Sequence, residues 1–283
     1  MHHFPIGIFD SGIGGLSVLQ ALRSELPREH LVYVADSGHA PYGERDEAFV
    51  QQRTSAIARH LRAQHGIKAL VIACNTATAA AVEQLRREMP DLLLIGVEPA
   101  LKPAALSSQT HHVGVLATRG TVGSARFARL LGEHSQQTHF AVQACDGLAL
   151  AIEQASAQPL PARLQDSELW AHCVRHTEAL GTFGLGTGEI DTLVLGCTHY
   201  IFVKQELRAL LGPDIELIDT GTAIARQVRR LLAQSGLLVP EAVPPTAAPQ
   251  IQLYATGGLG SLQAAAQRWL ELPPGSCAHI EIG

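Results

Sequence analysis

Short runs of apolar residues, rich in Val, Ile and Leu, alternate with helical patterns along almost the whole 283-residue chain. Residues 6–9, 31–34 and 69–72 are such runs, and helical patterns separate them, from about residue 16 to 26 and up to about residue 65. A run that is apolar at every position is typical of a strand buried on both faces, as in parallel sheets covered by helices. The sequence therefore predicts an α/β fold with mainly parallel sheets.

The pattern starts again in the second part of the chain. Residues 113–116 (VGVL) resemble residues 6–9 (IGIF), and a Gly-containing turn follows each of these two runs. Residues 193–198 (LVLGCT) resemble residues 70–75 (LVIACN). A weak internal repeat of this kind indicates two similar α/β domains, related by a pseudo-two-fold axis, with a cleft between them. Residues 158–190 are interpreted as an insertion with a helix of its own, and residues 251–254 and 279–282 as late strands.

Composition and charge exclude several classes of protein. Hydrophobic residues make up 46% and charged residues 17% of the chain, and the net charge is -5 without a basic cluster, so no nucleic-acid partner is expected. No apolar run approaches the roughly 20 residues of a membrane span, and the start lacks the pattern of a signal peptide. Five cysteines at irregular spacing suggest neither disulfides nor a zinc site. We expect a cytoplasmic protein with reduced thiols.

Cys74 and Cys197 stand at equivalent places in the two half-repeats. Each follows an apolar run and precedes a helical pattern, which is the carboxyl end of a strand, where open α/β sheets bind ligands. A helix N-terminus favours a thiolate, so we expect it to lower the pKa of Cys74. Either cysteine alone could be a buried packing residue, but two at equivalent positions favour a function. Cys145, Cys173 and Cys277 are interpreted as packing residues.

Two thiols on opposite walls of a cleft suit the inversion of a tetrahedral carbon. One group removes a proton from one face while the other delivers a proton to the opposite face, and the roles exchange with direction. Because the Cα–H of an amino acid is a weak acid, neighbouring groups must tune the thiols and stabilise the developing negative charge. Asn75 and Thr76, with nearby backbone N–H groups, could cap the helix or bind a substrate carboxylate.

Asp10, His199 and Glu153 are the candidates for tuning the thiols. Asp10 ends the first apolar run, and Ser11 follows it in a turn whose glycines do not fit G-x-G-x-x-G and which lacks a Walker lysine, so a dinucleotide site is not expected. A role of Asp10 as a turn residue only stays open. His199 lies two residues after Cys197 and could polarise its thiol. Glu153 is a weaker candidate, since most helical glutamates are solvated.

At these residues the sequence closely resembles the bacterial glutamate racemases, which form part of the aspartate/glutamate racemase family. The matching segments span nearly the whole chain and occur in the order of the family. They are residues 8–16 (IFDSGIGGL), 36–43 (DSGHAPYG), 73–78 (ACNTAT), 96–99 (GVEP), 195–200 (LGCTHY) and 254–258 (YATGG).

The resemblance implies a glutamate racemase that needs neither pyridoxal phosphate nor a metal and supplies D-glutamate for peptidoglycan. It implies that Cys74 and Cys197 are the two bases, assisted by Asp10, Glu153 and His199. It also implies a discontinuous first domain, residues 1–98 plus 212–283, and a second domain, residues 99–211; assembly as a homodimer stays open. The residues expected to contact glutamate are Asp10, Ser11, Pro41, Tyr42, Gly43, Asn75, Thr76, Thr118, Thr121, Thr198 and His199.

Three other functions stay open. An aspartate racemase would share both cysteines, but its second motif typically has a glutamate where this chain has His199. A cysteine hydrolase would use one thiol as a nucleophile and leave the other strand-end cysteine unexplained. A two-lobed binding protein would tolerate serine at both cysteine positions. The segment 158–188, with its Gly-rich residues 181–188, departs from the family pattern.

Overall fold

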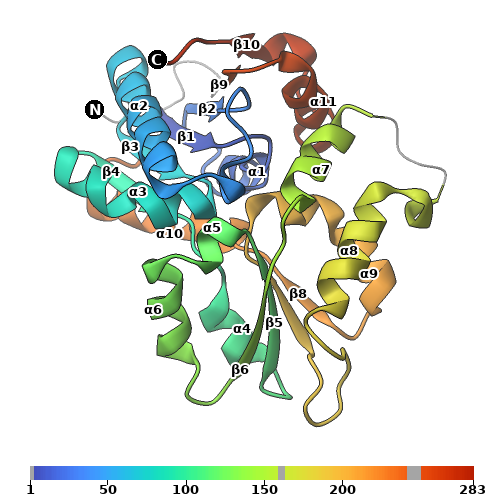
Figure 1. The fold of residues 1–283 in the computed structure, drawn as a ribbon. Coiled ribbons are helices and arrows are strands. Elements are labelled where there is room, and N and C mark those ends of the chain that lie inside the picture. The colour runs from blue at the N-terminus through green and yellow to red at the C-terminus, as the bar shows by residue number, and fades with distance from the viewer. Residues whose placement is uncertain (1–2, 159–162, 241–249) are drawn as a thin grey trace.

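The protein is described by a computed structural model that covers residues 3–158, 163–240 and 250–283. Its strands form two fully parallel sheets, as the apolar runs predicted. Figure 1 shows the elements of the larger sheet in the upper half of the molecule and those of the smaller sheet in the lower half.

The larger, six-stranded sheet has the order β10-β9-β2-β1-β3-β4, and the smaller, four-stranded sheet has the order β6-β5-β7-β8. The order β2-β1-β3-β4 of the first is therefore repeated by β6-β5-β7-β8 of the second, which is the structural counterpart of the weak internal repeat. The strands are β1 (Ile6–Asp10), β2 (Leu31–Ala35), β3 (Ala69–Ile72), β4 (Leu93–Gly96), β9 (Ile251–Ala255) and β10 (Cys277–His279), then β5 (His112–Ala117), β6 (His139–Ala144), β7 (Thr192–Leu195) and β8 (Glu216–Ile218).

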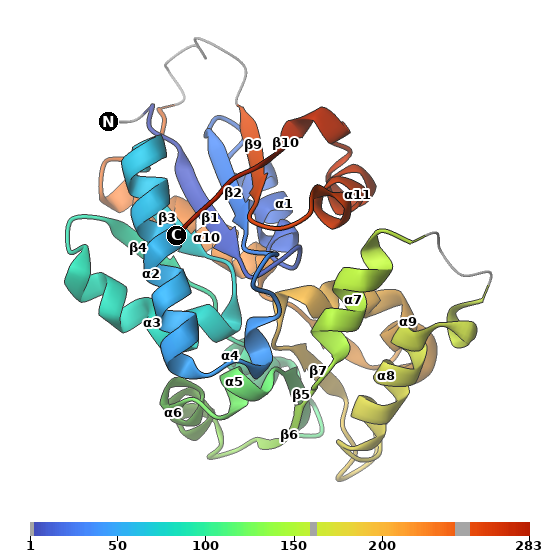
Figure 2. The ribbon, with the colours of Figure 1, turned by 45° about the horizontal axis from the view of Figure 1, so that its top comes forward.

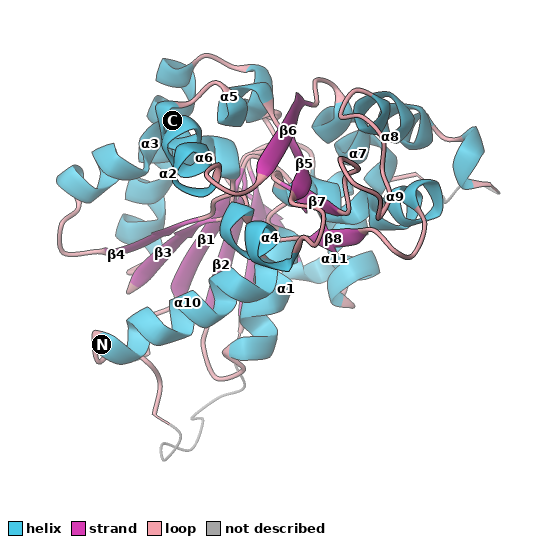
Figure 3. Cartoon of the chain, turned by 90° about the horizontal axis from the view of Figure 1, so that it is seen from below, coloured by secondary structure: helices cyan, strands magenta, loops and turns pink. Residues whose placement is uncertain are grey.

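Helices cover both faces of the larger sheet, which is why its inner strands β1, β2 and β3 are almost continuously apolar. Figure 3 shows α2 (Glu47–His65) and α3 (Asn75–Glu88) on one face, and α1 (Leu16–Glu25) and α10 (Gly221–Gln234) on the other. Alternate residues of one strand enter different cores, since Tyr33 packs with the α1 side and Val34 with the α2 side.

The smaller sheet is covered in the same way. On one face, α4 (Leu101–Ser107) and α6 (Ala125–His134) share a core with β5 and β7. On the other face lie α7 (Leu148–Ser156), α8 (Glu168–Glu178) and α9 (Lys204–Leu211). Figure 2 shows α7 beside α11 (Leu259–Leu270), which belongs to the larger sheet, so the two halves are in direct contact.

The structure corrects some sequence-based boundaries. The last strand covers Cys277–His279 rather than residues 279–282, and β6 and β8 were not predicted. Because β8 pairs with β7, the chain leaves the smaller sheet after Ile218, later than residue 212. The segment 158–190 does contain its own helix, α8, although residues 159–162 of this segment lie outside the described residues. Within the described ranges, no helix combines the length and apolar character needed to cross a membrane.

Candidate active site

The predicted site residues meet at the carboxyl ends of equivalent strands from the two sheets. Cys74 follows β3 and Cys197 follows β7, and these two strands hold the same position in their sheets. Asp10 ends β1, and Thr118 directly follows β5, the counterpart of β1. Both cysteines are buried, with exposed fractions of 5% and 7%. Strand ends of this kind are the usual ligand site of parallel α/β sheets.

Cys74 is the N-cap residue of α3, and its sulfur accepts a hydrogen bond from the Ala77 backbone N–H at 3.5 Å. The Ser11 hydroxyl lies 4.0 Å from the same sulfur. Burial and the nearby charge of Asp10 raise the pKa of Cys74 well above its usual range, and the Ala77 N–H offsets this only in part. The helix N-terminus does lower this pKa through the Ala77 N–H, as expected, but desolvation outweighs it and the net shift is upward.

The Asp10 carboxylate connects the two halves of the site. Its Oδ1 accepts the Ser11 backbone N–H at 2.5 Å and the Ser11 hydroxyl at 3.1 Å. Its Oδ2 accepts the hydroxyl of Thr198, the residue after Cys197, at 2.8 Å. Burial raises the pKa of Asp10, although His199 and Thr198 lower it in part. Asp10 can therefore hold or release a proton beside Cys74 while it contacts the wall that carries Cys197.

Cys197 has a partner of a different kind, the buried imidazole of His199. The Nδ1 atom of His199 lies 3.7 Å from Cys197 Sγ, and its Nε2 lies 2.7 Å from Glu153 Oε1. Burial alone would lower the pKa of His199, but the contacts with Cys197 and Glu153 raise it well above its usual value. The structure thus places Glu153, the weakest candidate from the sequence, in direct contact with His199.

The glycine-containing turn after Asp10 lies between the two walls, and its glycine positions have no room for a side chain. The Ile13 backbone N–H donates to Glu153 Oε1 at 2.6 Å. A Cβ atom at Gly12 would stand 1.7 Å from that oxygen, and one at Gly14 would stand 2.3 Å from His199 Nδ1. Close approach of the backbone to Glu153 and His199 therefore requires glycine at both positions.

A cluster of hydroxyl groups also joins the two halves, because Thr76 at the start of α3 meets Thr118 and Thr121 of the smaller half. The Thr76 and Thr118 Oγ1 atoms are 2.8 Å apart, and the Thr118 hydroxyl donates to that of Thr121 at 2.9 Å. Asn75 is buried, and its Oδ1 atom has no hydrogen-bond partner among the described residues. These groups can donate to a carboxylate or accept from an ammonium group.

The loop Pro41–Tyr42–Gly43 reaches this hydroxyl cluster. Gly43 packs so closely on Thr118 that a Cβ atom would stand 2.8 Å from the Thr118 Cβ. The buried Tyr42 hydroxyl donates to Asp36 Oδ2 at 2.5 Å, and Arg53 binds both oxygens of Asp36 at 3.0 Å. The sequence pattern did not reveal this Asp36–Arg53 pair. The sequence held one indication of the pair, because Arg53 falls among the core-facing positions of its helix, α2.

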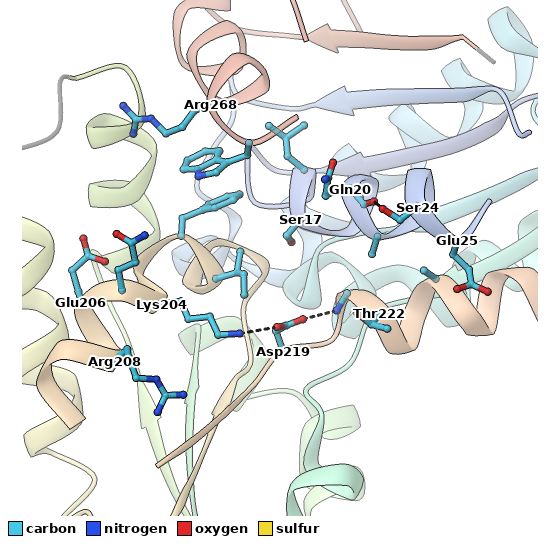
Figure 4. A pocket seen from close by; sticks show the side chains of 18 of the residues that line it. Ser17, Gln20, Ser24, Glu25, Lys204, Glu206, Arg208, Asp219, Thr222 and Arg268 are labelled. Atoms are coloured by element: carbon cyan, nitrogen blue, oxygen red, sulfur yellow. Dashed lines mark hydrogen bonds and ion pairs between the residues drawn. The ribbon is translucent and has the colours of Figure 1, made fainter. Parts of the chain in front are cut away.

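A large pocket lies away from the cysteines. A pocket of about 1170 Å³ opens between α1, α9, α10 and α11, and none of the predicted site residues lines it. Figure 4 shows charged side chains around it, including Lys204, which pairs with Asp219 at 3.7 Å. Among the described residues, no group of three His, Cys, Asp or Glu side chains is arranged to hold a metal ion.

Comparisons with known proteins agree with this geometry. Residues 6–228 match the model of the Asp/Glu/Hydantoin racemase family. A glutamate racemase of Ectopseudomonas mendocina is 46% identical over 260 residues, 92% of each chain. A glutamate racemase of Cupriavidus pinatubonensis is 47% identical over 268 residues, 95% of this chain and 92% of the relative.

The chain is also similar to solved structures of glutamate racemases. The crystal structure of glutamate racemase isoform RacE1 from Bacillus anthracis has a TM-score of 0.83 at 30% identity and covers 99% of this chain and 98% of its own. Escherichia coli glutamate racemase, in complex with L-glutamate and the activator UDP-MurNAc-Ala, has a TM-score of 0.78 at 32% identity, with coverages of 94% and 95%. On the family match and these relatives, the chain belongs to the Asp/Glu/Hydantoin racemase family.

Proposed function

We propose that this protein interconverts L- and D-glutamate by proton removal and return at Cα, with Cys74 and Cys197 as the two bases and without a cofactor. The observation that carries the proposal is the placement of two buried cysteines at the same strand end of two equivalent sheets, each with its own proton-handling partner. Asp10 lies on the Cys74 side, and His199 lies 3.7 Å from Cys197 Sγ.

The reaction needs one thiolate and one thiol at the start of each turnover. In one direction, one cysteine takes the Cα proton while the other gives its proton to the opposite face, so thiol and thiolate exchange places and no net proton is consumed. In the reverse direction the cysteines exchange roles. His199, held by Glu153 at 2.7 Å, can give a proton to or take one from the sulfur of Cys197, and Asp10 can do so beside Cys74.

Substrate binding falls to groups that join the two halves. Thr76, Thr118 and Thr121 offer hydroxyl groups, and Asn75 offers an unpartnered amide oxygen. Donors to the α-carboxylate would stabilise the negative charge that develops when the Cα proton leaves. Ser11, Thr198 and the loop Pro41–Gly43 complete the proposed contacts with glutamate.

Two further parts of the proposal concern organisation and role. The two halves act as domains, one formed by residues 1–98 with the chain after β8, and the other by the chain from residue 99 through β8, with glutamate bound between them. The product D-glutamate would serve peptidoglycan synthesis, in keeping with the named function of the relatives as glutamate racemases.

The test is incubation of the protein with L-glutamate in deuterated water without added cofactor. We expect optical rotation to disappear while deuterium enters Cα, and we expect Cys74→Ala and Cys197→Ala each to abolish the loss of rotation. L-Aspartate is the matched control substrate. Rotation lost with aspartate but not glutamate would assign the activity to aspartate, and rotation lost in either alanine variant would refute the two-base scheme.

A further inference from the structure

Tyr33 is a buried phenol that the proposed chemistry does not use. It lies in the middle of β2, paired with Ile8 of β1 and Leu253 of β9, and its exposed fraction is 0%. Its ring belongs to the core on the α1 side of the sheet. A tyrosine at the centre of an apolar core requires a hydrogen-bond partner for its hydroxyl, because an unpaired buried hydroxyl is costly.

The partner of Tyr33 is the backbone of the active-site turn. The hydroxyl donates to the Gly12 carbonyl at 2.6 Å. The next three carbonyls of the turn, those of residues 13–15, accept N–H groups from the first turn of α1. Helix formation therefore accounts for these three carbonyls, while the Tyr33 hydroxyl satisfies the Gly12 carbonyl.

The fit between Tyr33 and the turn is tight. A Cβ atom at Gly15 would stand 2.9 Å from the Tyr33 hydroxyl and 2.7 Å from Asp10 Cβ. Burial, Asp10 and Glu153 all raise the pKa of Tyr33 well above its usual value of 10.0, so the phenol keeps its proton and remains a donor. Gly15, the N-cap of α1, thus packs directly against the Tyr33 phenol and the Asp10 side chain.

The turn that Tyr33 holds serves both walls of the site. On one side, the Ser11 backbone N–H and hydroxyl bind Asp10, beside Cys74. One residue after Gly12, the Ile13 N–H binds Glu153 Oε1, which also contacts His199 beside Cys197. A shift of Gly12 would therefore change the hydrogen bonds of both Asp10 and Glu153.

We propose that Tyr33 is a positioning residue for racemisation: its hydroxyl fixes the Gly12 carbonyl and thereby holds the turn that orients Asp10 and Glu153. The inference rests on the proposed function for its kinetic consequence. Its structural part, that the phenol holds the turn, stands on the contacts alone. Tyr33 itself touches neither cysteine through any hydrogen bond in the described residues, so it acts through the turn.

Tyr33→Phe removes one oxygen atom and keeps the ring. We expect kcat for glutamate to fall about tenfold in both directions, about the effect of one lost hydrogen bond, with KM changed by less than about twofold on the same reasoning. The matched control is Tyr254→Phe, in the neighbouring strand β9, where the half-buried ring packs on His65 at 5.3 Å. That variant should keep the wild-type kcat.

A double-mutant cycle separates positioning from a general structural effect. If Tyr33 acts through the turn that binds Glu153, the losses from Tyr33→Phe and Glu153→Gln should not multiply, and the double variant should lose less than the product of the two single losses. Losses that multiply would overturn the proposed route. In a second pair of variants, 4-aminophenylalanine at position 33 keeps an N–H donor and should restore kcat, whereas 4-fluorophenylalanine should not. Equal rates for these two would also refute the proposal.

Amide hydrogen exchange tests the structural part independently of activity. Peptides covering residues 11–16 should exchange faster in Tyr33→Phe than in the wild type or in Tyr254→Phe, while peptides from α6, far from the turn, should not change. Unchanged exchange at residues 11–16 would refute the inference. Faster exchange in a protein whose wild type does not racemise glutamate would uphold the role of Tyr33 in holding the turn and refute the proposed function instead.

Discussion

Replacement of Gly12 by alanine is the most direct way to perturb the contact between the active-site turn and Glu153. A Cβ atom there would stand 1.7 Å from Glu153 Oε1 and 2.6 Å from its Cδ. The backbone itself accepts alanine, because Gly12 is not in the left-handed region. The carboxylate is the end of a flexible side chain, so it can rotate away, but it then loses both contacts of Oε1, with the Ile13 N–H and with His199.

The magnitude follows from these two contacts. A hydrogen bond to a charged group contributes about 1.5–3 kcal/mol, so the two set an upper limit of about 3–6 kcal/mol. Replacement of glycine by alanine returns about 0.4–1 kcal/mol through the unfolded chain. We expect Gly12→Ala to lower the free energy of unfolding by about 3 kcal/mol, and to lower Tm by about 6–12 °C. Since His199 loses its partner, kcat/KM should fall about a hundredfold.

The assay is urea unfolding followed by circular dichroism, with racemisation of L-glutamate followed by optical rotation. The matched control is Gly132→Ala in α6, where a Cβ atom would meet nothing within 4 Å. Helix propensity alone predicts that this control stabilises the protein by up to about 1 kcal/mol. Equal stabilities of Gly12→Ala and Gly132→Ala, or a wild-type kcat/KM in Gly12→Ala, would refute the reasoning.

Three further predictions follow from burial. Folding raises the pKa of Asp10, so the contribution of this group to the free energy of unfolding falls as pH rises above the ordinary carboxyl value of about 4. Asp10→Asn should therefore raise the urea midpoint at pH 7 while it lowers kcat. An unchanged midpoint would contradict this. Because burial and Asp10 raise the pKa of Cys74, its alkylation by iodoacetamide, mapped by mass spectrometry in Cys197→Ala, should still accelerate above pH 9; a plateau by pH 8 would contradict this. Lys68 and Glu29 form an ion pair at 2.5 Å with side chains only 2% and 1% exposed, so Lys68→Met should destabilise the fold by about 3–5 kcal/mol in urea unfolding. Its control, Asp91→Asn in an exposed pair, should leave the midpoint unchanged, and equal midpoints for the two variants would contradict the prediction.

The sequence predicted those strands that are buried on both faces. Residues 6–9, 69–72 and 193–195 are continuously apolar because helices cover both sides of each sheet, and their order along the chain predicted parallel sheets. β6 escaped prediction because it is an edge strand whose residues are mostly half-buried and mix His and Gln with apolar residues. β8 is only three residues long, too short for any periodicity to show.

The candidate site, like the fold, was predictable from the sequence only in part. The equivalent positions of Cys74 and Cys197 were visible as repeated local patterns. Glu153 was only a weak candidate from the sequence, and the resemblance to glutamate racemases supplied Thr118 and Thr121. Contacts between distant residues were not visible, since no local pattern joins Ile13 to Glu153 across 140 positions. Tyr33 looked like one more apolar strand residue, and only the structure shows that its hydroxyl binds the active-site turn.

Proton exchange by single-cysteine variants is the most direct test of the central claim. With one base left on one face of Cα, a variant can remove a proton and return a deuteron to the same face only. In deuterated water, we therefore expect Cys74→Ala to exchange the Cα proton of one glutamate enantiomer with retention, and Cys197→Ala to exchange that of the other, with no racemisation by either. Exchange of the same enantiomer by both variants, or racemisation by either, would contradict two cysteines acting on opposite faces.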